Sequence, residues 1–173
     1  MMLNAAENSS IELCDTFRLT KMYSEEVDRV LSREASLLHS IFLRHCDKVA
    51  AKGGSKAMSS EGWLSFVSQF QLFDIRCDIH LIYRIFRMSC MSDEICGKMD
   101  FASWQEALAR LADMLVLPPA SEENDGEFLD RIMHAEDLAK WQKERISAEA
   151  HESPLPLDEK LSKVIRLLRF RFC

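Results

Sequence analysis

The sequence predicts an all-α protein, and three observations support this fold class. First, the 173 residues include only five glycines and four prolines, so long helices are favoured over a β fold with many turns. Second, apolar residues recur at steps of three and four in several segments. Third, residues 58–70 and 99–112 repeat one pattern, in which a tryptophan follows a methionine by five residues. Two such units, of roughly forty residues each, predict a pair of helix–loop–helix hands.

Composition restricts the class of protein. Hydrophobic residues make up 47% of the chain and charged residues 29%, which is typical of a soluble globular domain with a core. The formal net charge of −6 argues against non-specific binding to nucleic acid. The chain shows no signal peptide and no run of about 18 apolar residues, and its six cysteines form no CxxC pair. These features predict a cytoplasmic protein with reduced cysteines.

The chain divides into five expected parts, of which the first two are an irregular arm at residues 1–20 and a paired helical domain at residues 21–117. Within that domain, Ser24 provides a hydroxyl cap before Glu25 and Glu26, so a helix should begin there. We expect this helix to continue toward the Gly53-Gly54 break. Its apolar positions step by three and four residues: Val27, Leu31, Ala35, Leu38, Phe42 and Cys46.

Three further helices are expected in the paired domain. The first follows Ser59, the second follows the cap Asp78, and the third follows the cap Asp100. The middle helix is apolar nearly all round, so it should be the most buried of the three. Its polar side chains share one stripe that should face solvent or a partner: His80, Arg84 and Arg87. The inward positions of the outer two helices are Trp63, Phe66, Val67, Phe70, Trp104, Ala107, Leu108, Leu111 and Leu115.

The remaining three parts lie beyond the paired domain. Residues 118–127 read as an acidic linker, residues 128–152 as a polar helix with a thin apolar stripe, and residues 153–173 as a basic amphipathic tail. Such a tail could bind an anionic membrane, a calmodulin-like groove or an acidic protein surface, or dock on its own acidic body. Its apolar side consists of Leu157, Leu161, Val164, Ile165, Leu168 and Phe172.

The loops between the paired helices can be compared with calcium-binding loops. A working EF-hand loop has 12 residues, with oxygen ligands at positions 1, 3, 5 and 9, a glycine at position 6 and a bidentate glutamate at position 12. Position 8 is the apolar residue that pairs the two loops. We assign Met58 and Met99 to this position, because each directly precedes the cap of the following helix.

With this alignment, neither loop carries a full set of calcium ligands. The second loop has Gly97 at position 6, but its only charged calcium candidates are Glu94 and Asp100. The first loop has Gly62 at position 12 and no carboxylate at a ligand position. Two carboxylates across two sites cannot offset the dehydration of Ca²⁺, so we expect a degenerate pair of hands that binds no metal.

Other chemistry has no signature in the sequence. The candidate zinc ligands lack the usual two-knuckle spacing, and no cysteine has the flanking residues of a catalytic nucleophile. The Gly-Gly-Ser-Lys run at residues 53–56 lacks the earlier glycine and the strand of a phosphate-binding loop. We therefore predict no catalytic residues, no cofactor and no enzymatic activity. The zinc candidates considered are His45, Cys46, Cys77 and His80.

The paired unit also carries residues that point to a family. These are the spacings Met58–Trp63 and Met99–Trp104, the residues Phe86 and Met99 that frame a lengthened loop, and the ending WQEAL…LA at residues 104–112. On these motifs, residues 38–112 resemble the tubulin-polymerisation-promoting protein domain, a divergent EF-hand-like helical domain, and similar paired modules of ciliary and flagellar axonemes. The resemblance implies a microtubule-associated structural role with tubulin as a partner. The glycine-rich C-terminal segment of that family has no counterpart here, so its zinc or nucleotide properties are not carried over.

We therefore expect a non-enzymatic structural protein of the microtubule cytoskeleton, in a ciliary or flagellar axoneme and part of a larger assembly. In this interpretation the degenerate EF-hand-like pair carries extended C-terminal helical arms, and the acidic surface of tubulin attracts the basic tail. Two alternatives stay open: a calcium-responsive regulator that binds a target helix, and a membrane-peripheral adaptor. The expected partner-binding residues are Lys160, Lys163, Arg166, Arg169, Phe170, Arg171 and Phe172, with His80, Arg84 and Arg87 as a second face.

Overall fold

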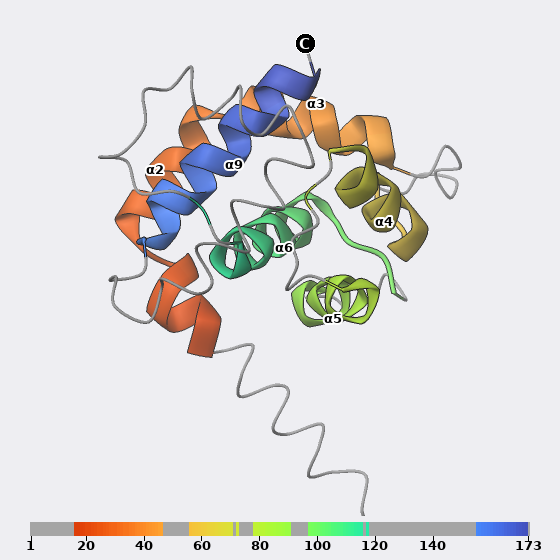
Figure 1. Ribbon diagram of the computed structural model, residues 1–173, viewed down its shortest axis with the longest axis horizontal. Coiled ribbons are helices and arrows are strands. Elements are labelled where there is room, and N and C mark those ends of the chain that lie inside the picture. The colour runs from red at the N-terminus through yellow and green to blue at the C-terminus, as the bar shows by residue number, and fades with distance from the viewer. Residues whose placement is uncertain are drawn as a thin grey trace, which may run out of the picture.

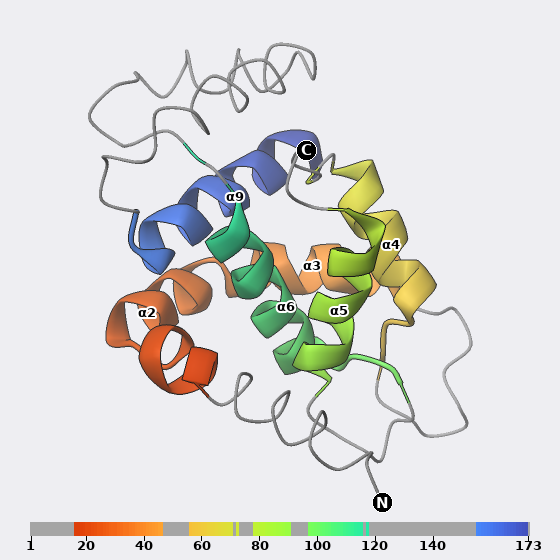
Figure 2. The same cartoon turned by 60° about the horizontal axis from the view of Figure 1, so that its bottom comes forward.

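The computed structural model describes residues 16–46, 56–70, 72, 78–90, 97–115, 117 and 155–172. This part of the chain contains seven helices and no strand beyond a single bridge between two loops, so the all-α prediction is confirmed. Helix α6 lies at the centre and packs against α5 on one side and against α3 and α9 on the other (Figures 1 and 2). The helices are η1 (Arg18–Met22), α2 (Glu25–Arg33), α3 (Ala35–His45), α4 (Ser60–Gln69), α5 (Ile79–Ser89), α6 (Phe101–Met114) and α9 (Leu157–Phe172).

Four helices begin at the polar residues that the sequence indicated. In each case the side-chain oxygen of the cap accepts a hydrogen bond from the backbone N–H three residues later, which satisfies one of the free donors of the first turn. The predicted starts are therefore confirmed. The caps are Ser24 for α2, Ser59 for α4, Asp78 for α5 and Asp100 for α6.

The long helix expected after Ser24 is divided in two. Its backbone leaves the helical conformation at Glu34, which has φ −99° and ψ 8° and separates α2 from α3. The change of direction allows both helices to pack along α9. Helix α3 then ends at His45, and Cys46 is extended. Upstream, η1 crosses the expected boundary at residue 20: it begins in the segment that was expected to be an irregular arm and ends at Met22.

The core joins the two repeated tryptophans through one phenylalanine. Trp63 and Trp104 are both fully buried. The Phe66 ring lies between them, with its centroid 5.4 Å from that of Trp63 and 5.3 Å from that of Trp104. Trp63 Nε1 also donates a hydrogen bond to the Ile82 carbonyl at 3.1 Å. The repeated sequence pattern thus forms the contact between the two helix–loop–helix units.

Helix α6, and not α5, is the most buried helix of the paired domain. Every residue of α6 from Ala107 to Ala112 is buried, because this helix is covered by α5, α9 and α3. Helix α5 packs on α6 and α4 with one face only. The expectation that α5 would be the most buried was therefore wrong. The buried residues of α5 are Ile82, Ile85, Phe86 and Ser89.

The basic tail forms α9, which docks on the body of the protein. Figure 1 shows this helix lying across α2 and α3, and it also packs on α6. The prediction that the tail forms an extended arm was therefore wrong for residues 157–172, because burial of the apolar stripe holds this helix on the core. The expected acidic linker, at 118–127, and the expected polar helix, at 128–152, lie outside the described residues. The buried residues of α9 are Leu157, Leu161, Val164, Ile165, Leu167 and Leu168.

Candidate functional site

The two helix–loop–helix units are joined at their loops by a pair of hydrogen bonds. The Met58 N–H donates to the Met99 carbonyl and the Met99 N–H donates to the Met58 carbonyl, each at 2.8 Å. Both side chains are fully buried. This antiparallel bridge confirms that the two methionines pair the loops. Since the next residue in each loop caps the following helix, the loops and the starts of α4 and α6 are fixed together.

The first loop is closed at the point where a calcium ligand would stand. Gly62 occupies position 12 of this loop, the place of the bidentate glutamate in a working EF-hand. A Cβ atom at this residue would lie 2.7 Å from the His45 carbonyl oxygen and 3.0 Å from Met58 Cγ. These distances are too short for non-bonded atoms, so a side chain here would require the backbone of α3 to move. The end of α3 therefore fills the space that a ligand would need.

The second loop keeps the expected turn but uses its aspartate as a cap. Gly97 has a φ of +75°, in the left-handed region that glycine tolerates. Asp100 Oδ1 accepts a hydrogen bond from the Ser103 N–H at 2.8 Å, which holds the carboxylate on the first turn of α6. The other calcium candidate, Glu94, lies outside the described residues. Among the residues that the structure does describe, no group of three His, Cys, Asp or Glu side chains could hold a metal ion.

Of the zinc candidates that the structure describes, His45 and Cys46 lie at the end of α3 and His80 lies on α5. His45 Nδ1 lies 2.9 Å from the Ile41 carbonyl oxygen, and its Nε2 lies 3.0 Å from Gln69 Oε1. Both ring nitrogens therefore face oxygen atoms of the protein. Cys77 falls outside the described ranges, and His80 is exposed on α5.

Two basic residues of α9 cap the ends of other helices. Lys160 Nζ donates to the carbonyl oxygens of Asp113 and Leu115, at 2.8 and 3.0 Å, and so satisfies the C-terminal end of α6. At the other end of α9, Arg171 donates to the carbonyl oxygen of Phe70, the last residue of the α4 turn. Burial lowers the pKa of Arg171. These two residues, predicted to bind a partner, hold α9 on its own body.

The remaining tail residues divide between internal contacts and solvent. Arg169 forms an ion pair with Glu34 at the break between α2 and α3, and the Arg44 guanidinium lies 5.5 Å from the centroid of the Phe172 ring. Phe170 is 49% exposed and is the most accessible apolar residue of α9. Binding of a partner by the tail stays a prediction. The other two predicted contact residues, Lys163 and Arg166, also have interaction partners.

The second predicted face is solvent-exposed. His80, Arg84 and Arg87 all point away from the core of the described structure, as their stripe in the sequence indicated. Two large apolar residues of the same helix are exposed with them: Ile79 is 49% exposed and Tyr83 is 38% exposed. The sequence analysis missed these two residues, although their spacing places them on the same side of the helix. We call this set of five residues the α5 face.

A buried charged cluster connects the N-terminal segment to α6. Glu106 is 2% exposed and binds two arginines: its Oε2 lies 2.9 Å from Arg18 Nε, and its Oε1 lies 2.7 Å from Arg110 Nη2. The Arg110 guanidinium also lies 4.3 Å from the centroid of the Phe17 ring. The sequence analysis missed this cluster. An i,i+4 acid–base pair within the apolar helix at 101–114 was the available signal, but nothing local identified Arg18 as the third member.

A single partly buried cysteine lies close to this cluster. Burial, together with the charges of Asp100 and Glu106, raises the pKa of the Cys90 thiol to about 11. The thiol is therefore protonated at neutral pH. Since the thiolate is the reactive form, this environment disfavours nucleophilic chemistry at Cys90.

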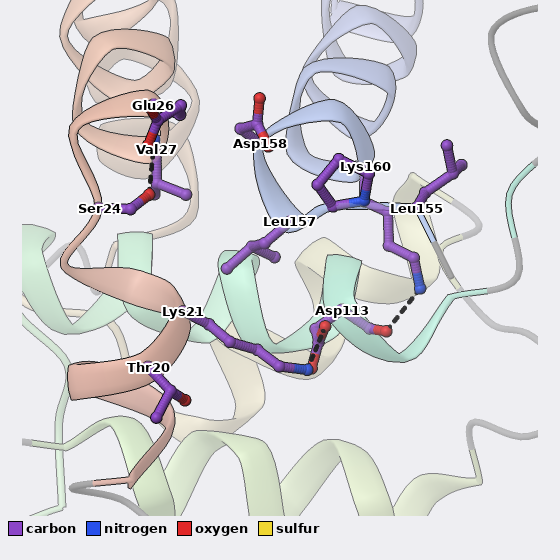
Figure 3. Close-up of a pocket in the computed structure, with 11 residues that line it drawn as sticks. Thr20, Lys21, Ser24, Glu26, Val27, Asp113, Leu155, Leu157, Asp158 and Lys160 are labelled. Carbon is purple, nitrogen blue, oxygen red and sulfur yellow. Dashed lines mark hydrogen bonds and ion pairs between the residues drawn. The ribbon is translucent and has the colours of Figure 1, made fainter. Parts of the chain in front are cut away.

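A cleft of about 580 Å³ lies between η1, α2, the end of α6 and the start of α9. Figure 3 shows Lys21 and Lys160 entering it from opposite sides and meeting at Asp113. Lys21 Nζ lies 2.9 and 2.7 Å from the two Asp113 carboxylate oxygens, and Lys160 binds the backbone of the same residue. Glu26 and Asp158 add negative charge to the lining. The charged groups here link the surrounding elements to each other, and both lysines are engaged in that role.

Comparison with known protein families, curated proteins and solved structures finds no match to this chain. Within the described residues, no helix is long and apolar enough to cross a membrane.

Proposed function

We propose that this chain is a non-enzymatic structural protein of the microtubule cytoskeleton, with a place in the axoneme of a cilium or flagellum. It acts as a fixed helical module that binds tubulin or neighbouring axonemal proteins. The observation that carries the proposal is the closed pair of loops, in which Met58 and Met99 bind each other and the next residues cap α4 and α6.

A closed pair of this kind favours a structural role over a calcium switch. In sensor EF-hand proteins, ion binding changes the angle between paired helices and exposes a groove for a target. Here Gly62 occupies the position of the bidentate ligand in the first loop, and a Cβ atom at this residue would lie 2.7 Å from the His45 carbonyl oxygen. In addition, α9 already covers one face of the helices through its buried apolar stripe. In this proposal the paired helices keep one arrangement, so the module presents the same surface to a partner at all times.

The choice of partner rests on the sequence resemblance and on charge. The Met–Trp spacings and the ending of α6 resemble a domain associated with tubulin, whose surface is acidic. The exposed basic residues of α5 are suited to such a surface by charge. Because α9 uses Lys160, Arg169 and Arg171 for internal contacts, the α5 face takes the place of the tail as the first candidate for partner contact.

The test is the location of the full chain in a ciliated cell. A fluorescently tagged full-length protein should lie along the axoneme or along cytoplasmic microtubules, and it should remain there after detergent extraction of the membrane. The tag alone, expressed at the same level, is the control. A diffuse signal that detergent removes would contradict the proposal. Deletion of residues after Ser153 is unsuitable here, because it would remove a helix of the core.

A further inference from the structure

Helix α5 carries positive charge without any compensating acid on the same helix. Its sequence is IHLIYRIFRMS, with one histidine, two arginines and no acidic residue, in a chain that has 28 Asp and Glu residues against 22 Lys and Arg residues. His80, Arg84 and Arg87 follow each other at steps of four and three, so they lie on one side of the helix. All three are exposed. The helix therefore presents a positive stripe on a protein of net charge −6.

The two arginines of this stripe differ from the other arginines that the structure describes. Arg84 and Arg87 have no ion pair or hydrogen bond with any described residue. Elsewhere in the described chain, each arginine side chain has a partner of its own. The guanidinium groups of Arg84 and Arg87 each offer several hydrogen-bond donors in a fixed fork that fits carboxylates. The arginines with partners are Arg18, Arg29, Arg33, Arg44, Arg110, Arg166, Arg169 and Arg171.

Apolar surface accompanies the charge. Ile79 and Tyr83 are four residues apart, so their side chains are neighbours on the same side of α5. They are 49% and 38% exposed, and each lies one residue before a basic residue of the stripe. Tyrosine and arginine are among the residues that contribute most to protein interfaces. The combination suits a protein segment better than a simple counter-ion.

The opposite side of the helix fixes the position of this surface. Ile82, Ile85 and Phe86 are buried against the core, and the Ile82 carbonyl accepts the hydrogen bond from Trp63 Nε1. Helix α5 therefore cannot rotate about its axis without breaking these contacts. Figure 1 shows α5 at the edge of the described structure, beside α6 and α4. A surface held in this way loses little conformational entropy when a partner binds.

We propose that the α5 face is a docking surface for an acidic segment of a partner protein. The inference deepens the proposed function, on which the choice of a protein partner rests. Arg84 and Arg87 bind carboxylates of the segment, and Tyr83 and Ile79 contact its apolar atoms. An anionic membrane fits less well. A membrane-bound amphipathic helix buries its apolar face in the lipid, whereas the main apolar side of α5 is packed against the core of the protein.

The test measures binding of a fluorescently labelled oligoglutamate peptide to the full-length protein by anisotropy at low salt. Arg84→Gln/Arg87→Gln should weaken binding about tenfold, as expected for the loss of two exposed charge contacts. Tyr83→Ser should weaken it by a smaller factor, without any change in net charge. The matched control is Arg29→Gln/Arg33→Gln, which removes the same charge from the exposed side of α2 and should leave binding unchanged. Circular dichroism checks that each variant is folded.

Several outcomes would overturn the inference. Two results with the peptide would do so: no binding by the wild-type protein, or equal weakening by both arginine pairs, which would mean that only net charge matters. Stronger binding to phosphatidylserine vesicles than to the peptide, lost in Arg84→Gln/Arg87→Gln, would assign the surface to a membrane. Peptide binding with the expected variant pattern but no binding to microtubules would leave the docking surface in place and remove the proposed function.

Discussion

At the scale of single residues, the structure depends on polar groups that the core surrounds. Glu106 lies between Arg18 and Arg110 and joins the N-terminal segment to the central helix. Burial of these charges is tolerated only because each has a partner, since an unpaired charge in the interior is costly. Local sequence could show the pairing of Glu106 with Arg110, which are one helical turn apart. It could not show Arg18, which is distant in the chain.

Replacing the buried acid should therefore destabilise the protein strongly. Glu106→Gln leaves two arginines without their counter-charge, and we expect the free energy of unfolding to fall by about 3 kcal/mol or more. Urea denaturation followed by circular dichroism measures this change. Glu25→Gln is the control, because the Glu25 side chain is 85% exposed and pairs with Arg29 at the surface. Its effect should be about 0.5 kcal/mol or less; similar losses in both variants would contradict the account of the cluster.

Gly62 provides a second test at this scale. Alanine normally stabilises a helix by about 1 kcal/mol relative to glycine. At this position, however, the new Cβ would meet the His45 carbonyl oxygen at 2.7 Å. We therefore expect Gly62→Ala to lower the free energy of unfolding by about 1 kcal/mol or more.

The control for this substitution is Ser65→Ala, on an exposed position of the same helix. It should be neutral or slightly stabilising. Thermal unfolding of the two variants gives the comparison. If Gly62→Ala raised the melting temperature, the space at position 12 of the first loop would be open, and the argument against a ligand there would fail.

At the scale of elements, local signals were enough to place helix starts. Four caps and the pairing of Met58 with Met99 followed from residue type and spacing. Features that depend on packing between distant segments did not. The break at Glu34 and the docking of α9 both arise where α2, α3 and α9 meet. The sequence showed that α9 has an apolar side but not which surface would cover it.

The docking of α9 predicts a clear difference between its two sides. Leu161 is fully buried, whereas Phe170 is 49% exposed. Leu161→Ala should lower the free energy of unfolding by about 2–5 kcal/mol, because it leaves a cavity in the core. Phe170→Ala removes a larger side chain but should cost less than about 1 kcal/mol, since about half of that residue is exposed to solvent. Chemical denaturation distinguishes them; equal, small effects would mean that α9 is an arm and not part of the core.

At the scale of the whole molecule, the structure changes which surface can meet a partner. The sequence identified both basic stripes, because charge and helical spacing are local properties. It could not rank them, because the ranking depends on contacts made by the tail. With Lys160 and Arg171 bound to backbone carbonyls of the body, the stripe on α5 is the more accessible of the two. We expect binding at this surface to be independent of calcium, because the first loop has no room for a side chain at position 12.

The measurement that tests the central claim most directly is co-sedimentation of the full-length protein with purified microtubules, with either Ca²⁺ or a chelator present. A fixed module that recognises an acidic surface should pellet with microtubules to the same extent in both conditions, and less at high salt. Two results would contradict the account: a protein that stays in the supernatant with microtubules in both conditions, or one that pellets only when Ca²⁺ is present.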